Sequence, residues 1–300
     1  MPNHATAQQI GTGADFPIRE TREFRFTDHD FARVRELIYR TAGISLTPVK
    51  RDLVYGRLAR RLRVRGLSSF ADYLRILKSG DRQEQEAFVN ALTTNLTSFF
   101  REPHHFPILA EHLKGLGGRR PLSIWCCAAS TGEEPYSIAM TVVEQFGTFT
   151  PPVRILATDI DTSVLDRARQ GVYRLDRTDR LPREQLRRFF LRGDGNNAGL
   201  VRVKPELQKL ITFRQLNLLD PEWPMRERFD AIFCRNVMIY FDKETQYGIL
   251  KKFVPLLHPE GLLFAGHSES FHHAADLFQV RGKTVYAPRG GAPVTAGRRP

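Results

Sequence analysis

Three charged residues, Glu134, Asp159 and Arg235, stand at or just after short apolar runs, where an α/β sheet binds its ligand. The first run is followed by AASTGEEP (128–135), whose small residues let backbone N–H groups and a helix N-terminus approach a ligand. The second run ends in ATDID (157–161), and an acid at that strand tip typically accepts hydrogen bonds from ribose hydroxyls. These residues predict a site for a ligand that contains a nucleoside.

The ligand that this pattern favours is S-adenosylmethionine (SAM). The first loop is not G-x-G-x-x-G and no G-K-[ST] follows it, which weakens NAD and ATP as candidates. Glu133 and Glu134 would repel a pyrophosphate, whereas Glu134 can accept hydrogen bonds from an ammonium or from hydroxyls. For Glu133 the competing interpretation is that it complements the helix dipole. SAM carries a ribose and an amino-acid end but no phosphate, so Asp159 would hold its ribose, while Asp161 is expected to cap the next helix.

The run FCRNVMIYF (233–241) bears on the methyl acceptor. It lacks the P-P-[Y/F] that is typical of enzymes that methylate exocyclic amines, and Cys234 is not preceded by the proline typical of cytosine-C5 nucleophiles. Arg235 at this tip suits an anionic acceptor. The alternative interpretation is a structural arginine that pairs with an acid on a helix.

The elements that must position these residues alternate between β-type and helical patterns after Pro121, which predicts a doubly wound parallel α/β sheet. The expected strands cover residues 122–128, 153–159, 211–217, 229–234 and 261–266. The expected helices cover residues 133–146, 163–169 and 243–257. Residues 171–210 are too long for a simple crossover, and a glycine-rich turn (192–199) between apolar runs predicts an inserted hairpin.

The first part of the chain has the pattern of helices over residues 24–43, 49–66, 69–77 and 85–95. Thr27, Asp30 and Gly43 are expected to cap the first of them. Residues 50–65 hold seven basic residues and one acid, a net charge of +6, half of the chain's +12. Such a concentration implies a partner with concentrated negative charge, either an acidic protein surface or a phosphate backbone.

Composition sets the outer limits. The 300 residues contain 41% hydrophobic and 26% charged residues, which excludes a wholly disordered chain, and no apolar run approaches the ~18 residues of a membrane span. Three cysteines without a C-x-x-C make a disulfide scaffold or a zinc site poor interpretations, so no metal is expected. We therefore expect a reduced, cytoplasmic protein with disordered tails at 1–23 and 288–300.

Long strings then resemble one family, the chemotaxis receptor methyltransferases (CheR-type protein-glutamate O-methyltransferases). The resemblance runs from about Phe24 to Ala287. It rests on ALTTNLTSFFREPHHFPILAEH (91–112), AASTGEEPYSIAM (128–140), ATDIDTSVLDRARQGVYR (157–174), FDAIFCRNVMIYFDKETQ (229–246) and FAGHSES (264–270). It implies a bacterial signal-transduction enzyme that esterifies receptor glutamates and releases S-adenosylhomocysteine. It also implies an N-terminal all-α domain (24–95) for substrate recognition and a Rossmann-like SAM-binding domain (96–287) with a small antiparallel β-subdomain (171–210).

The resemblance also implies the site residues. The cofactor contacts would be Asn95, Thr97, Arg101, Glu134, Asp159, Asn217, Leu218, Arg235 and Asn236. Arg235 and Tyr240 are expected to orient the acceptor carboxylate, with Arg101 near the reacting groups. His104-His105 and the HSES string (267–270) are not expected to be catalytic. No general base is needed, because a glutamate side chain, whose pKa is ordinarily about 4.3, is already a carboxylate at neutral pH.

The expected partners are methyl-accepting chemotaxis receptors, acting on a monomeric enzyme. Arg57, Arg60, Arg61 and Arg63 would face their acidic methylation helices, while Val54, Leu58 and Leu62 pack on the domain. In the family the β-subdomain can also accept a receptor's C-terminal peptide as an extra strand. Two alternatives remain open: a nucleic-acid methyltransferase, against which the missing P-P-[Y/F] counts, and a SAM-binding regulator without catalysis, against which Arg235 and Tyr240 count.

Overall fold

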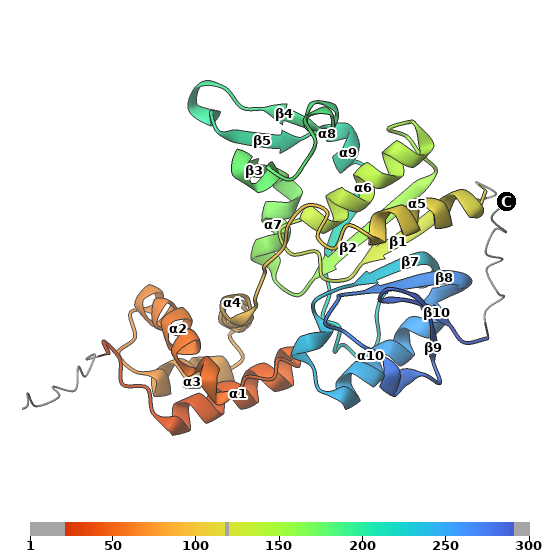
Figure 1. Cartoon of the computed structure of the whole chain (residues 1–300). Helices are drawn as coiled ribbons and strands as arrows, with labels where there is room; N and C mark the ends of the chain where they lie inside the picture. Colours follow the sequence, from red (N-terminus) through yellow and green to blue (C-terminus); the bar gives the residue numbers. More distant parts are fainter. Residues whose placement is uncertain (1–21, 118–119, 291–300) are drawn as a thin grey trace, which may run out of the picture.

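The computed structural model describes residues 22–117 and 120–290 (Figure 1). Most of the two expected tails, residues 1–21 and 291–300, lies outside the described residues. Within the described residues no helix is both long and apolar enough to cross a membrane.

The N-terminal part is a small helical domain. It consists of α1 (Asp28–Ala42), the 3₁₀ turn η1 (Pro48–Lys50), α2 (Arg51–Arg65), α3 (Phe70–Lys78) and α4 (Arg82–Leu92). The capping of α1 is as predicted: Thr27 and Asp30 form a capping box, and Gly43 ends the helix in the left-handed conformation. Val34, Ile38, Val54, Leu58 and Leu62 are fully buried in its core.

The C-terminal part is built on a seven-stranded sheet of order β6-β2-β1-β7-β8-β10-β9. Its strands are β1 (Leu122–Cys126), β2 (Val153–Asp159), β6 (Ile211–Gln215), β7 (Phe229–Cys234), β8 (Leu257–Ala265), β9 (Phe278–Gly282) and β10 (Val285–Pro288). Strands β6, β2, β1, β7 and β8 are parallel. The five predicted strands are thus parallel, as expected, and the sheet is extended beyond β8 by the β9–β10 hairpin, which was not predicted and runs antiparallel. Its turn contains Thr284 with a positive φ of 55°, and a turn this short can only join antiparallel strands.

Helices cover both faces of this sheet, so that two apolar cores form (Figure 1). One face is covered by α5 (His105–Gly115), which the sequence patterns did not predict, and α6 (Glu133–Phe146), together with α7 (Thr162–Gln170) near the edge strand. The other face is covered by α10 (Lys243–Leu256). The chain leaves β1 in one direction through β2 and β6 and returns to β7 on the other side. The loops after β1 and β7 therefore diverge at a switch point, where such sheets bind ligands.

The expected insertion forms a separate antiparallel sheet of order β3-β5-β4. It contains β3 (Val172–Arg174), η2 (Leu175–Thr178), α8 (Arg183–Phe189), β4 (Phe190–Arg192), η3 (Gly195–Asn197), β5 (Leu200–Val203) and α9 (Pro205–Gln208). The predicted hairpin is β4–β5, with η3 in its turn. Figure 1 places this β-subdomain and the helical domain on two separate projections from the sheet domain.

Candidate active site

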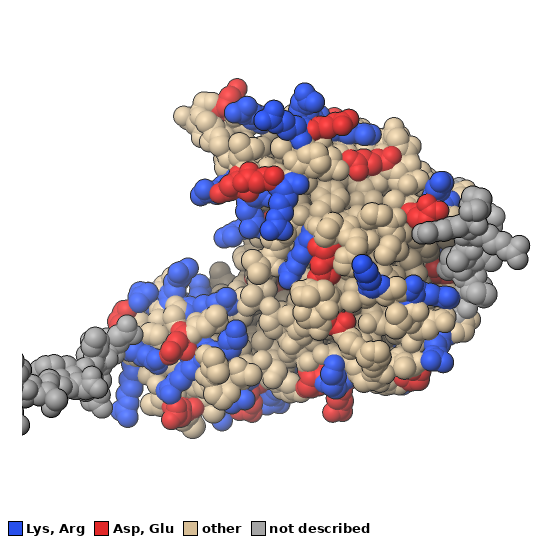
Figure 2. Space-filling model, in the orientation of Figure 1, with Lys and Arg blue, Asp and Glu red and all other residues tan. Residues whose placement is uncertain are grey.

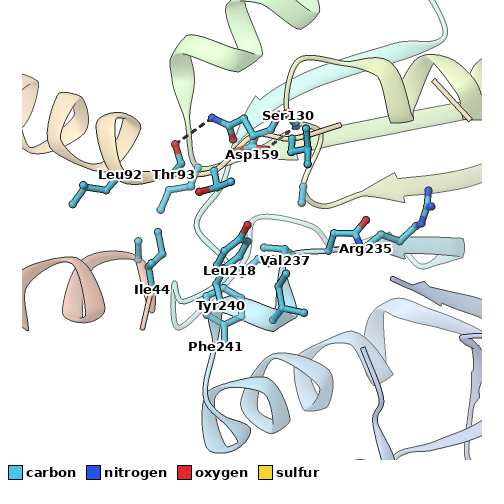
Figure 3. A pocket seen from close by; sticks show the side chains of 18 of the residues that line it. Ile44, Leu92, Thr93, Ser130, Asp159, Leu218, Arg235, Val237, Tyr240 and Phe241 are labelled. Carbon is cyan, nitrogen blue, oxygen red and sulfur yellow. Dashed lines mark hydrogen bonds between the residues drawn. The ribbon is translucent and has the colours of Figure 1, made fainter. Parts of the chain in front are cut away.

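A cavity of about 340 Å³ lies where the helical domain meets the carboxyl ends of the parallel strands (Figure 3). Its lining comes from the N-terminal helical domain, the linker after α4 and the loops after β1, β2, β6 and β7. All ten residues expected to bind cofactor or orient the acceptor line it. They are Asn95, Thr97, Arg101, Glu134, Asp159, Asn217, Leu218, Arg235, Asn236 and Tyr240.

The loop after β1 is held open by backbone geometry. Ser130 has a φ of 48° and donates its backbone N–H to Asp159 Oδ2 over 2.8 Å. Gly132 has a φ of 100°, and a Cβ there would come within 2.7 Å of the Tyr173 hydroxyl and 2.9 Å of Ala168 Cβ. A side chain at Gly132 would therefore displace the first turn of α6, whose Glu134 lines the cavity.

Asp159 is buried at the tip of β2. Its Oδ1 accepts a hydrogen bond from the Asp161 N–H over 3.0 Å, and burial raises the pKa of its carboxyl to about 6 despite its backbone donors. Each carboxylate oxygen still has a second lone-pair direction for a donor in the cavity. Asp161 caps α7, as predicted, by accepting from the N–H groups of Ser163 and Val164.

Arg235 is fully buried, and its guanidinium does not face the open cavity. It donates through Nη1 to Glu134 Oε2 and through Nη2 to the carbonyl oxygen of Arg101, and its Nη2 lies 3.4 Å from Glu102 Oε2. In Figure 3 its side chain extends away from Tyr240. Both of its Nη atoms are therefore engaged by protein groups, and the expectation that this guanidinium orients an acceptor carboxylate stays a prediction. The alternative interpretation, a structural arginine paired with a helix acid, describes the contacts.

Glu133 makes an ion pair in addition to its favourable position at the N-terminus of α6. Its buried carboxylate pairs with the Arg177 guanidinium from η2, and Arg177 also donates to the carbonyl oxygen of Thr97 over 2.8 Å. Arg177 thus joins the β-subdomain to α6 and to the linker that lines the cavity.

The linker and the β6 loop bind the two domains together. Asn95 donates through Nδ2 to Asp161 Oδ2 over 2.8 Å, and its carbonyl oxygen accepts from Ser130 Oγ over 3.0 Å. Asn217 donates to the Thr41 carbonyl oxygen over 2.7 Å. Both asparagines line the cavity, but each side-chain Nδ2 already donates to a protein oxygen. Their expected contact with a cofactor would therefore be made by atoms other than these Nδ2 donors. Arg101 donates to the Leu96 carbonyl oxygen through one Nη.

The loop after β7 is held by Glu269, a residue for which the sequence patterns predicted no structural role. Buried Glu269 accepts hydrogen bonds from three backbone N–H groups, those of Asn236, Met238 and Gly266. Asn236 has a φ of 57°, and a Cβ on Gly266 would come within 2.4 Å of its Nδ2. Burial raises the pKa of Glu269, although these donors oppose the rise. The sequence signal that could have indicated this role is the acid in HSES (267–270), which lies just past the carboxyl end of β8.

Two histidines and an acid lie close together beside the site. Glu102, His104 and His105 offer ligand atoms within 4.8 Å of one another. Glu102 is nevertheless paired with the Arg235 guanidinium, which would repel a cation. Burial, assisted by Arg235, lowers the pKa of His105 to about 4, and its Nε2 lies 3.0 Å from Thr284 Oγ1.

The basic face of α2 lies outside the cavity and is only partly free. Arg57 donates to the Thr93 carbonyl oxygen over 2.6 Å, and Arg61 makes a bidentate pair with buried Glu84 over 3.0 and 2.7 Å. The expectation that all four arginines present their charge outward is therefore wrong for these two. Arg63 is exposed and pairs with Glu23, and Arg60 is exposed with no ion pair to any described residue.

Comparisons with known proteins cover nearly the whole described chain. The family model "CheR methyltransferase, all-alpha domain" matches residues 29–93, and "CheR methyltransferase, SAM binding domain" matches residues 95–287. The "Chemotaxis protein methyltransferase 2" of Pseudomonas aeruginosa is 58% identical over 280 residues, which are 92% of this chain and 99% of that protein. The "Chemotaxis protein methyltransferase" of Escherichia coli is 52% identical over 271 residues, 90% of this chain and 94% of that protein.

Proposed function

Because this chain belongs to the CheR methyltransferase family, we propose that it transfers a methyl group from SAM to glutamate side chains of chemoreceptor proteins, forming glutamate methyl esters. The observation that carries the proposal is the convergence of all ten expected residues on one cavity between the helical domain and the sheet. Residues of both domains line the cavity, so that a ligand bound there would contact the helical domain and the sheet domain together.

The chemistry of the cavity fits SAM. Asp159 is a buried acid at the strand tip with unused lone-pair directions, which suits a ribose diol. Glu134 has its carboxylate against Arg235 on one side and lines the cavity on the other, so it would hold the ammonium end. Buried Leu218 and Phe241 and half-buried Val237 supply apolar surface for a base. SAM when bound would supply a methyl group on a positively charged sulfur.

The residues around the acceptor need only to hold and orient a carboxylate. An acceptor glutamate is ionised at neutral pH, so no side chain has to remove a proton. The reacting atoms must lie in line at near-attack distance, which is a matter of positioning. With Arg235 engaged by Glu134, two of the donors that line the cavity, the Tyr240 hydroxyl and the free nitrogens of Arg101, lie on the loop after β7 and on the linker and are assigned this role.

Tyr240 is well placed for that role because both of its backbone groups are fixed. Its N–H donates to the Val237 carbonyl oxygen over 3.1 Å, and its carbonyl oxygen accepts from the N–H of Ser45 in the helical domain over 3.0 Å. A phenol can orient a carboxylate by a hydrogen bond without neutralising it. We assign this orienting role to Tyr240.

The receptor contacts beyond the cavity are part of the same proposal. The exposed arginines of α2, Arg60 and Arg63, would meet acidic receptor helices. The β-subdomain has β3 and β4 as its edge strands, and a receptor's C-terminal peptide would add a strand to one of them. The enzyme would act as a monomer.

Incubation with methyl-labelled SAM and membranes that contain chemoreceptors tests the reaction. We expect label on the receptor, and we expect mild base to release it as methanol, since carboxyl methyl esters hydrolyse under those conditions. Label that survives base would contradict ester formation. A parallel incubation with receptors whose methylated glutamates are replaced by alanine controls for transfer to other side chains.

A further inference from the structure

Exposed apolar side chains gather at the mouth of the cavity. Leu53 from α2, Leu96 from the linker and Ile239 from η4 (Met238–Tyr240) are 38%, 75% and 50% exposed, and all three line the cavity. We call these three residues the apolar rim. They come from three elements far apart in the sequence, so neither the packing of one helix nor a single loop explains their convergence.

The rim adjoins a second hollow, whose charged lining residues are three arginines (Arg101, Arg177 and Arg180) and two aspartates (Asp176 and Asp179). A second cavity of about 510 Å³ is lined by Leu96, Thr97 and Arg101, which it shares with the first, and by Arg177 and Arg180 near η2 of the β-subdomain. Figure 2 shows Lys and Arg side chains on both projections that border the hollow, over the helical domain and over the β-subdomain. The open surface therefore runs from one projection, past the cavity mouth, to the other.

The charge of the residues along this surface indicates what kind of partner would bind there. On the helical-domain side Lys50 is exposed, lines the cavity beside Leu53, and makes no ion pair with any described residue. The acids of the cavity, Glu134 and Asp159, are already engaged by Arg235 and by backbone N–H groups. An elongated, acidic segment with apolar side chains beside its glutamates complements this arrangement, and a helix offers such side chains three and four positions from each glutamate.

We infer that the apolar rim of Leu53, Leu96 and Ile239, with Lys50 beside it, seats the apolar flank of an acidic amphipathic helix of the receptor and so presents one glutamate to the cavity. This inference rests on the proposed function and names how its protein substrate is recognised. The rim would discriminate between glutamates by their apolar neighbours, while the surrounding basic residues attract acidic helices of any sequence.

Steady-state kinetics with receptor membranes test the inference through Leu96→Ser and Ile239→Ser. Both side chains are at least half exposed, so the fold should survive. We expect KM for the receptor to rise roughly tenfold for each variant, as partial burial of such a side chain is lost, while the dissociation constant for SAM changes less than about twofold. Val280→Ser is the matched control, because Val280 is 60% exposed on β9 and lines neither cavity.

The outcomes separate the two proposals. If wild-type enzyme forms no base-labile ester on receptors, the proposed function fails. If wild-type enzyme forms the ester and the rim variants keep the receptor KM of Val280→Ser, the function stands and the rim inference is overturned. Sedimentation of the wild type and variants supplies a third outcome: a wild-type dimer that dissociates in Leu96→Ser would show that a second copy of the chain covers the rim, and would also overturn it. For Lys50→Gln, a receptor KM that is raised at low salt and equals the wild-type value at high salt would support the charge component.

Discussion

Arg235, on the loop after β7, donates a hydrogen bond through Nη1 to Oε2 of Glu134 at the start of α6, and both side chains are buried. This pair ties together the two loops that diverge at the switch point of the sheet. It also gives Arg235 a positioning role, since its other nitrogen holds the carbonyl oxygen of Arg101.

Replacing Arg235 by alanine should destabilise the fold as well as the site. The change leaves buried Glu134 and half-buried Glu102 without their cation, and breaking a buried pair in this way costs about 3–5 kcal/mol. Urea unfolding monitored by circular dichroism measures this loss. The double variant Arg235→Ala/Glu134→Gln should recover part of it. If Arg235→Ala has wild-type stability but has lost turnover, Arg235 would instead have the role of orienting the acceptor carboxylate.

Replacing Asp159 by alanine should weaken SAM binding by about 1.5–3 kcal/mol, the range for a lost hydrogen bond to a charged group. Calorimetry with the purified protein measures it. An unchanged affinity would remove Asp159 from the cofactor site.

The affinity for SAM should depend on pH through the same residue. Burial raises the pKa of Asp159 to about 6 in the free protein, and donors from a ribose would favour its ionised form. The free protein thus holds the proton more tightly than the bound one, so affinity falls as pH falls through about 6. We expect roughly tenfold weaker binding at pH 5 than at pH 7. Asp159→Asn should show no such dependence, and an identical pH profile in both proteins would contradict the assignment.

Tyr240→Phe should lower kcat about tenfold to hundredfold, because a misplaced acceptor loses near-attack geometry. The dissociation constant for SAM should stay within about twofold, since the hydroxyl is assigned to the acceptor. A parallel loss of SAM binding would place the phenol on the cofactor instead.

The arginines of α2 should separate into two classes. Arg61→Ala strands the buried carboxylate of Glu84 and should cost about 3 kcal/mol of stability, the low end for a broken buried pair because Arg61 is partly exposed. Arg60→Ala should change stability by less than about 0.5 kcal/mol and raise the receptor KM only slightly. Thermal melts and receptor kinetics distinguish them. Equal melting temperatures for the two variants would contradict the Arg61–Glu84 pairing.

Hydrophobic periodicity predicted most of the helices and the parallel strands. The residue types that follow the predicted strands indicated that Glu134 and Asp159 line a ligand site. Both signals are local properties of the sequence. The antiparallel β9–β10 edge and α5 were missed, because short strands and an uncapped helix leave weak local signals. The pairings of Arg57 and Arg61 were also missed, and the pairing of Arg235 with a helix acid was only the alternative interpretation. Each partner is a carbonyl oxygen or carboxylate at least 23 positions away, and only the folded chain decides whether an arginine faces such a group or solvent.

The hydrogen bond from the Ser45 N–H to the Tyr240 carbonyl oxygen has a consequence for how such enzymes can be re-engineered. Together with the bond from Asn217 to the Thr41 carbonyl oxygen, it makes the helical domain a structural part of the catalytic loop. A chimera that exchanged helical domains to redirect receptor choice would have to keep the geometry of residues 41–45. Under the proposed function, a helical domain exchanged without these two hydrogen bonds would leave the Tyr240 carbonyl oxygen and the Asn217 amide without their present partners.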